Sequence, residues 1–203
     1  MLKKAFLVAG LMMVAADAHA LDPYMWGIGP RVGTMVIPGR YPLKLPEAVD
    51  GSSIEKVRHD VSIGVQAAYY LHSFQRMLLD ASLGFGKGYL DAQVMVKWNY
   101  VMQTGAMDFL LGGGTGFGSY RFKGDDPERL VIPYYPLRAE TSALIRDNTR
   151  GYQGTIYAQF AIPANHYYTN ADGDEEDAKA GVNFTVGVEL AVLFGDFTPP
   201  RPR

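Results

Sequence analysis

The chain has 203 residues, no cysteine and a formal net charge of −2, and 48% of its residues are hydrophobic. The lack of cysteine excludes a disulfide framework and thiolate chemistry. The slightly acidic balance argues against nucleic-acid binding. A chain of this length without disulfides is expected to be held together by core packing or by closure of a sheet.

The first twenty residues predict a secretory signal peptide. A basic start precedes an apolar run over 5–16, and the small-x-small tripeptide at 18–20 is typical of a cleavage site. An uncleaved membrane anchor is the alternative, but the apolar run is short for a spanning helix. We therefore expect residues 1–20 to be removed, residues 21–197 to form one domain, and residues 198–203 to form a Pro/Arg-rich tail.

Beyond the signal peptide, the hydrophobic pattern has a period of two, which indicates β-strands. Eight runs of about 9–15 residues alternate in this way, and a tilted strand of about 9–11 residues can cross a bilayer. No stretch with the helical period competes with them. The runs are 25–36, 57–71, 77–85, 91–102, 106–120, 137–147, 151–162 and 180–194.

Charged residues occupy only one face of each run. A lysine or arginine on the lipid side of a membrane barrel costs about 2–4 kcal/mol at mid-membrane, so hydrocarbon would enforce this segregation. A soluble barrel would show the reverse arrangement. The face opposite the apolar one carries Arg31, Arg58, Asp60, Asp80, Asp91, Lys97, Asp108, Arg138, Glu140, Arg146 and Glu189.

Every second connection between the runs is short, and three of the four others are long. This alternation predicts a meander with tight turns on one side of a membrane and longer loops on the other. Aromatic residues near the strand ends agree with interfacial belts. The expected turns are 72–76, 103–105 and 148–150, and the expected loops are 37–56, 86–90, 121–136 and 163–179.

Together, the signal peptide, the eight amphipathic runs and the alternating connections resemble the small outer-membrane β-barrel proteins of the OmpA/OmpX/OmpW type. The stretch 186–192, VGVELAV, is similar to the C-terminal assembly signal of such barrels. It departs from that signal at Val186, where a polar residue is usual, and the chain continues beyond it through Phe197.

This resemblance implies an all-β, eight-stranded antiparallel up-and-down transmembrane barrel in the cell outer membrane, without a cofactor. It also implies contact with outer-membrane lipids, including lipopolysaccharide, and with the barrel-assembly machinery during insertion. A partner protein outside the cell or in the periplasm is a further expectation.

A glycine-rich stretch, LLGGGTGFGSY at 110–120, has two interpretations. A phosphate-binding loop requires a different glycine spacing and a following helix, and neither is present. Glycines on one face of a strand would instead line the barrel interior opposite bulky side chains. This glycine wall comprises Gly84, Gly86, Gly112, Gly114, Gly116 and Gly118.

Inward charges are nearly balanced, so we expect a polar plug that fills the lumen, with an open cleft for a small ligand as the alternative. Closure of the barrel should bring Arg31 and Glu189 together. The expected lumen network consists of Arg31, Arg58, Asp60, Lys97, Arg138, Glu140 and Glu189.

No catalytic or metal site is predicted. The four histidines, at positions 19, 59, 72 and 166, lack the paired spacing of a zinc site. His72 precedes Ser73, but no orienting acid accompanies the pair. An acidic loop could share divalent cations with lipopolysaccharide phosphates or with a partner, or could simply be solvated. Its acidic residues are Asp172, Asp174, Glu175, Glu176 and Asp177.

The expected role is structural, adhesive or partner-docking, through the loops 37–56, 121–136 and 163–179 of a monomeric barrel. The alternatives are a narrow channel or transporter for small or apolar solutes, a lipid-modifying enzyme, and a soluble periplasmic barrel.

Overall fold

A computed structural model describes residues 25–37, 59–72, 74–86, 89–104, 107–122, 131–164, 167–169, 175–177 and 182–198. No helix within these residues is long and apolar enough to cross a membrane. The described strands are β1 (Met25–Ile37), β2 (His59–His72), β3 (Gln75–Gly86), β4 (Tyr89–Gln103), β5 (Met107–Phe122), β6 (Val131–Arg146), β7 (Arg150–Pro163), β8 (Tyr167–Thr169), β9 (Glu175–Asp177) and β10 (Asn183–Asp196).

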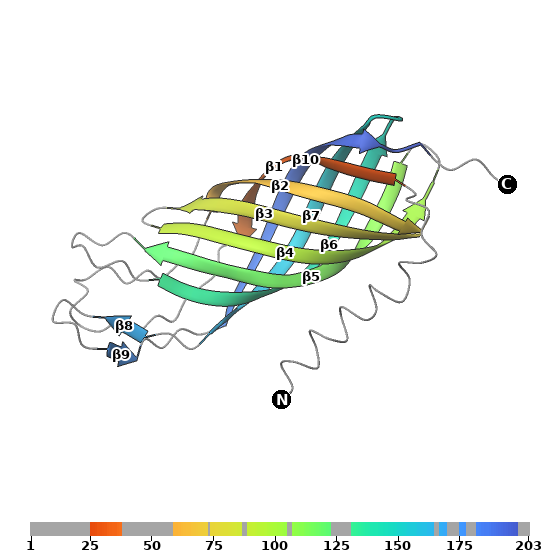
Figure 1. Ribbon diagram of the computed structural model, residues 1–203. Helices are drawn as coiled ribbons and strands as arrows, with labels where there is room; N and C mark the ends of the chain where they lie inside the picture. Colours follow the sequence, from red (N-terminus) through yellow and green to blue (C-terminus); the bar gives the residue numbers. More distant parts are fainter. Residues whose placement is uncertain are drawn as a thin grey trace.

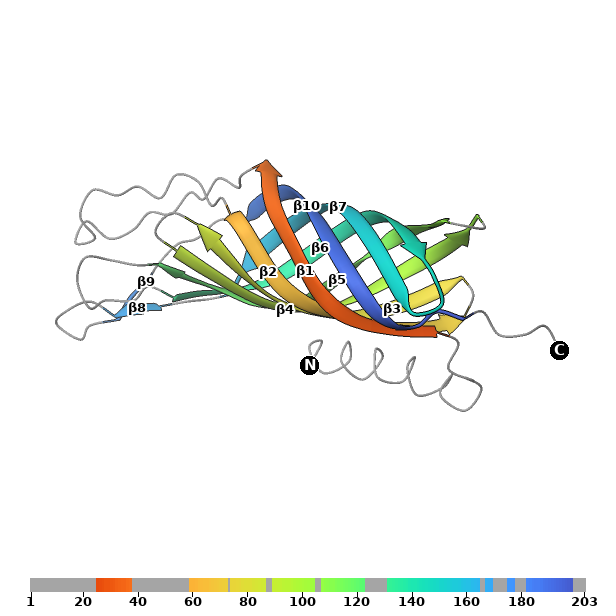
Figure 2. The same ribbon diagram turned by 90° about the horizontal axis from the view of Figure 1, so that it is seen from above.

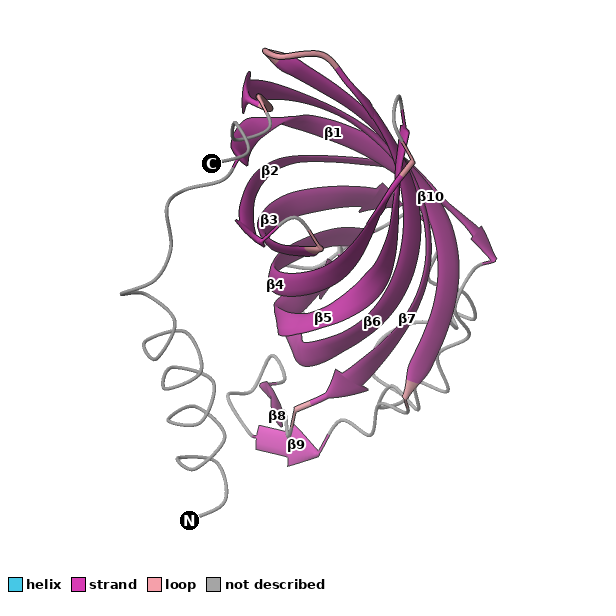
Figure 3. Cartoon of the chain, turned by 90° about the vertical axis from the view of Figure 1, so that its right-hand side faces the viewer, coloured by secondary structure: helices cyan, strands magenta, loops and turns pink. Residues whose placement is uncertain are grey.

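Eight of these strands form a closed barrel in the order β1-β10-β7-β6-β5-β4-β3-β2 (Figure 1). Every neighbouring pair in the barrel is antiparallel, and β1 pairs with β10 to close it. The end view in Figure 3 shows the strands curving round from β1 to β10. The predicted eight-stranded antiparallel barrel is therefore confirmed.

Side chains alternate between the two surfaces of the barrel, as the two-residue repeat of a strand requires. Outward residues are apolar and exposed, with Leu190 at 66% and Ile156 at 58%, whereas inward Lys97 and Asp80 are 2% and 0% exposed. This polarity is the reverse of that of a soluble protein and is typical of a barrel surrounded by hydrocarbon.

The connections differ at the two ends of the barrel. Short connections, at 73–74, 104–106 and 147–149, lie at the end where β1 begins and β10 finishes, which we call the turn end. The opposite, loop end has the connections 38–58, 87–88, 123–130 and 164–182. The small β8–β9 sheet lies beyond this loop end (Figures 1 and 2).

Most strand boundaries differ from the expected ones by one to three residues, and three regions need a larger correction. β6 begins at Val131 instead of residue 137. Residues 131–136 were expected to be a loop because they include Pro133 and Pro136, but the pairing of β5 with β6 continues to Arg121 and Val131. Proline lacks the N–H that a sheet ladder uses. Next to this irregular part of the ladder, the Pro136 carbonyl accepts a hydrogen bond from the Thr115 hydroxyl at 2.9 Å.

The other two boundary corrections concern β3 and the last long connection. β3 begins at Gln75, so residues 75 and 76, expected in a turn, belong to the strand. The expected loop 163–179 contains the β8–β9 hairpin. The last barrel strand covers Asn183–Asp196 instead of 180–194.

Candidate functional site: a lumen filled in three layers

A ring of alternating charges crosses the middle of the lumen. Three cations and three anions alternate, each within ion-pair distance of two neighbours, and all are buried. The strands β1, β3, β4, β6 and β10 supply them. In order around this ion ring, the residues are Arg31, Asp80, Lys97, Glu140, Arg138 and Glu189.

Glu189 joins two arginines in the ring. Arg138 donates to both of its carboxylate oxygens, at 2.9 and 2.5 Å, and Arg31 Nη1 donates to Oε1 at 2.6 Å. The two-pronged pairing of guanidinium with carboxylate is among the strongest charge-assisted contacts. Arg31 and Glu189 lie on adjacent strands, so the ring also spans the seam that closes the barrel.

The remaining contacts complete the ring. Asp80 accepts hydrogen bonds from Arg31 Nε at 3.0 Å and from Lys97 Nζ at 2.9 Å. Glu140 lies 3.4 Å from Lys97 Nζ and 2.9 Å from Arg138 Nε, but the Arg138 N–H is not aimed at the oxygen. Glu140 thus pairs with Arg138 electrostatically, without a hydrogen bond.

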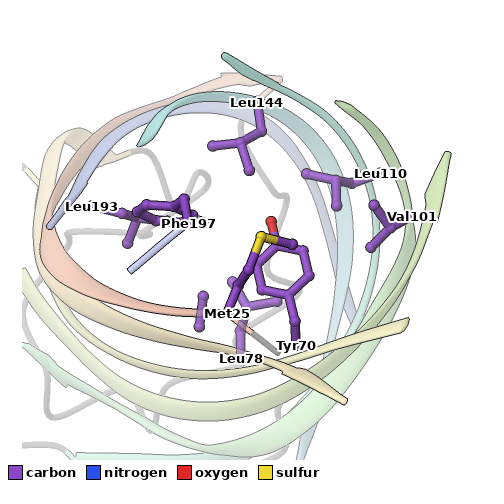
Figure 4. Packing of buried hydrophobic residues seen from close by; sticks show 9 residues of the cluster. Met25, Tyr70, Leu78, Val101, Leu110, Leu144, Leu193 and Phe197 are labelled. Carbon is purple, nitrogen blue, oxygen red and sulfur yellow. The ribbon is translucent and has the colours of Figure 1, made fainter. Parts of the chain in front are cut away.

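The turn end of the lumen holds an apolar cluster (Figure 4), next to the ion pair of the fully buried Asp108 with Arg146 Nε at 2.7 Å. In Figure 4, the labelled side chains lie around the inside of the barrel wall, with Phe197, the residue after β10, among them. The Phe197 side chain is fully buried, and its carbonyl accepts a hydrogen bond from Arg146 Nη1 at 3.0 Å. This apolar plug comprises Met25, Ala68, Tyr70, Leu78, Val101, Leu110, Leu144, Leu193 and Phe197.

Polar groups fill the lumen on the loop-end side of the ion ring. The Tyr134 hydroxyl donates to Asp91 at 2.7 Å, and its ring stacks on Tyr120 at 4.4 Å between centroids. Gln159 donates to Gln93 at 3.3 Å. This outer polar layer comprises Asp91, Gln93, Tyr120, Tyr134, Gln159, Asn183 and Thr185.

Several buried atoms of the outer polar layer lack a hydrogen-bond partner among the described residues. They are both amide atoms of Asn183, the Thr185 hydroxyl and the Gln159 carbonyl. These three side chains are at most 3% exposed. A buried polar group without a partner costs about 1–3 kcal/mol. Each of these atoms therefore carries such a cost.

Glycines of the expected glycine wall have two different roles. A Cβ at Gly118 would overlap the Tyr134 ring, so this glycine gives room to a bulky side chain. At Gly112, Gly114 and Gly116, however, a Cβ would overlap backbone carbonyls of β4. These three glycines therefore allow close approach of the β4 backbone, because a strand can come nearest to its neighbour where no Cβ intervenes. Gly84 is buried on the inward face, and Gly86 is half-buried.

Some of the predicted site residues lie outside the part of the chain that the structure describes. Arg58 is among them, and Asp60 lies in β2 without a described side chain. The same holds for the acidic loop, in which only the backbone of β9 is described. Among the described side chains, no three His, Cys, Asp or Glu residues converge on a metal-binding position.

Sequence reasoning missed several lumen residues, among them Tyr134, which was assigned to a loop, and Arg76 and Phe197. Arg76 is fully buried and donates to Gln153 at 2.9 Å and to Asn99 at 3.3 Å. Arg76 was left out of the predicted lumen network because it was assigned to a turn, although it lies an even number of residues from Asp80 and so on the same face of β3. Phe197 likewise continues the inward parity of β10.

The inverted polarity, the closed sheet and the filled interior define the class of the molecule. It is a small eight-stranded β-barrel of the outer-membrane type.

Comparison with the solved structure of NspA supports this fold. The crystal structure of Neisserial surface protein A (NspA) superposes with a TM-score of 0.50 at 9% identity, covering 81% of this chain and 96% of that one. Ail, the attachment invasion locus protein of Yersinia pestis, was solved in complex with the heparin analogue sucrose octasulfate. It superposes with a TM-score of 0.49 at 10% identity, covering 85% of this chain and 99% of that one. At these identities the likeness concerns the fold. Searches against protein-family models and curated proteins find no match.

Proposed function

We propose that the protein is an integral outer-membrane barrel that does not conduct solutes and that docks partners or surfaces through its long loops. In the proposed orientation, the turn end faces the periplasm and the loop end faces the outside of the cell. The predicted signal peptide directs export. The single observation that carries the proposal is the filled lumen.

A solute crossing the barrel would have to pass two barriers. The ion ring joins five strands, and moving any member apart exposes a buried charge, which is costly in a low-dielectric interior. The apolar plug below it would oppose the passage of polar solutes. An interior filled in this way supports a structural and docking role over the channel alternative.

The exterior supports placement in a membrane. Aromatic pairs lie on the outward surface towards the loop end, namely Phe117 with Tyr135 at 5.9 Å and Phe160 with Phe184 at 4.9 Å between ring centroids. Aromatic side chains at this level are typical of the membrane–water interface.

A lipid-modifying activity has little support in the described residues. His72, of the candidate His–Ser pair, stacks on Phe74 at 5.5 Å between ring centroids. A general base is instead expected to lie within hydrogen-bond reach of its nucleophile and of an orienting acid.

Conductance in planar bilayers tests the closed lumen. The purified protein is expected to give no current steps above the bare bilayer. A porin of known conductance in the same bilayers serves as the control for detection. Regular current steps from the unaltered protein would contradict the proposal.

Cysteine labelling tests the orientation, because the natural chain has no cysteine. Ser52→Cys, in the first long loop, is expected to react with a membrane-impermeant maleimide on intact cells. Thr104→Cys, in a turn between β4 and β5, is the matched control and should react only after the outer membrane is permeabilised. Labelling in the opposite order would show that the barrel is inverted. A photo-crosslinker at position 52 then reports docked partners.

A further inference from the structure

A groove of about 970 Å³ lies on the outward surface of the barrel, across β1 to β5. Its volume is within the range of ligand-binding sites, about 300–1,000 Å³. The lining includes one row of outward residues that pair in register from strand to strand, and all five are apolar and exposed. The row consists of Pro30, Val65, Ala81, Val94 and Phe117.

The groove climbs towards the loop end as it crosses the strands. Pro30 lies nearer the turn end of β1, whereas Phe117 lies nearer the loop end of β5. The steps between neighbouring strands, at about 4.8 Å each, add up to about 19 Å from β1 to β5. Because the strands of such a barrel tilt by about 40°, the row rises by about 12 Å. This rise is about half of the apolar band of about 25 Å, which corresponds to one leaflet of the membrane.

An arginine lies just beyond the loop-end limit of this groove. Ser119 lines the groove on β5, and Arg121 follows two positions later on the same face, about 7 Å further along the strand. The Arg121 side chain is exposed and forms no ion pair with the described residues. Its register neighbours are the apolar Leu90 and Val131. Among the described side chains, the other exposed arginine or lysine is Arg150, which lies at the turn end.

The apolar row and the arginine together fit a lipid that carries a phosphate. A hydrocarbon chain matches the apolar lining, and a guanidinium group pairs with phosphate through two parallel N–H···O contacts. A free phosphate would leave the groove empty, and an uncharged lipid would leave Arg121 without a counter-ion. The groove also extends over the depth of one leaflet, as one chain of such a lipid does.

We propose that this groove holds one acyl chain of the phosphorylated lipid anchor of lipopolysaccharide, and that a phosphate of the same lipid contacts Arg121. The proposal rests on the proposed function for the statement that the loop end faces the outside of the cell, where this lipid lies. The site is on the exterior of the barrel and is separate from the filled lumen.

Native mass spectrometry of the full-length protein in detergent micelles tests the site. The probe is lipid A, which carries phosphates, and the comparison lipid is the same molecule without its phosphates. One lipid A molecule is expected to stay bound to each barrel. It should bind about fivefold more tightly than the dephosphorylated form, which is the effect of one arginine near anionic headgroups.

Two variants separate the parts of the site. Arg121→Gln is expected to weaken the binding of lipid A about fivefold and to leave the binding of the dephosphorylated form unchanged. Ala81→Leu fills the middle of the groove and is expected to weaken the binding of both lipids. Arg150→Gln at the turn end and Ala143→Leu on the outward face of β6 are the matched controls and should bind like the unaltered protein. Heat-modifiable gel migration establishes that each variant is folded.

Three results would overturn the proposal. One is equally tight binding of the two lipid forms by the unaltered protein. Another is an unchanged affinity for lipid A in Arg121→Gln or in Ala81→Leu. The third is a dimer, free of lipid, that Ala81→Leu abolishes, because the groove would then hold a second copy of the chain. The closed lumen and the orientation are tested by conductance and labelling, so a failure of the lipid site is distinguishable from a failure of the proposed function.

Discussion

Replacing Glu189 by alanine is expected to destabilise the barrel by about 3–5 kcal/mol, because it breaks a buried ion pair and leaves the partners uncompensated. Glu189 accepts three hydrogen bonds from two arginines, at 2.5–2.9 Å. At about 1.5 kcal/mol for each charge-assisted bond, their loss amounts to about 4.5 kcal/mol. The two estimates agree, and three cations would then face two anions in the ring.

The loss can be measured by reversible urea unfolding in lipid vesicles. Trp26 and Trp98 are on the exterior, 48% and 43% exposed, so their fluorescence reports transfer out of lipid. Glu189→Gln keeps a hydrogen-bond acceptor but not the charge, so its free energy of unfolding should lie between those of the unaltered protein and of Glu189→Ala. Leu190→Val, at the adjacent outward position, is the control: it removes one lipid-facing methylene, and the expected loss is about 0.8 kcal/mol. A loss below about 1 kcal/mol in Glu189→Ala would refute the view that the ion ring holds the seam.

Three further outcomes are expected. Gly116→Ala should cost about 1–3 kcal/mol in the same unfolding assay, since the new Cβ overlaps the β4 backbone. Gly154→Ala, whose Cβ would meet only Leu190 at 3.8 Å, should be tolerated, and equal losses in the two would contradict this account. Phe197→Ala should cost about 3–5 kcal/mol by emptying the apolar plug, and a fully stable variant would show that the plug does not depend on it. Backbone N–H donors of Thr149 and Arg150, each 2.7 Å from Asp147, lower the pKa of that turn carboxyl. Because the folded pKa is depressed, this stabilisation is present above the unfolded pKa and is lost as the pH falls through the folded value. NMR titration of Asp147 should give a pKa below that of an unstructured aspartate, and an ordinary value would contradict it.

The orientation of side chains was predictable because a strand has an exact two-residue period. Once one charge in a run is assigned to the lumen, the others follow, which is why Lys97 and Glu140 could be placed on the inward face. The strand boundaries were harder to predict. Proline and histidine-serine segments resemble turns, so the start of β6 and the inward Arg76 were missed.

The partners within the lumen could not be predicted from one strand at a time. Which charges meet depends on the stagger between strands and on the tilt that closes the barrel. Asp80 and Arg31 are on strands that are not neighbours, yet they lie 2.9 Å apart. The role of the β5 glycines likewise depends on how closely the β4 backbone approaches.

Closure of the barrel has a consequence for how the molecule is made. Arg31 and Glu189 are separated by 158 positions in the chain, and they meet only where the first and last barrel strands pair. Until that final joining step, Glu189 has no access to Arg31, and an incomplete sheet carries unbalanced charge at its open edge. The ion ring is thus completed only when the first and last barrel strands pair, so a partly assembled sheet lacks this stabilisation.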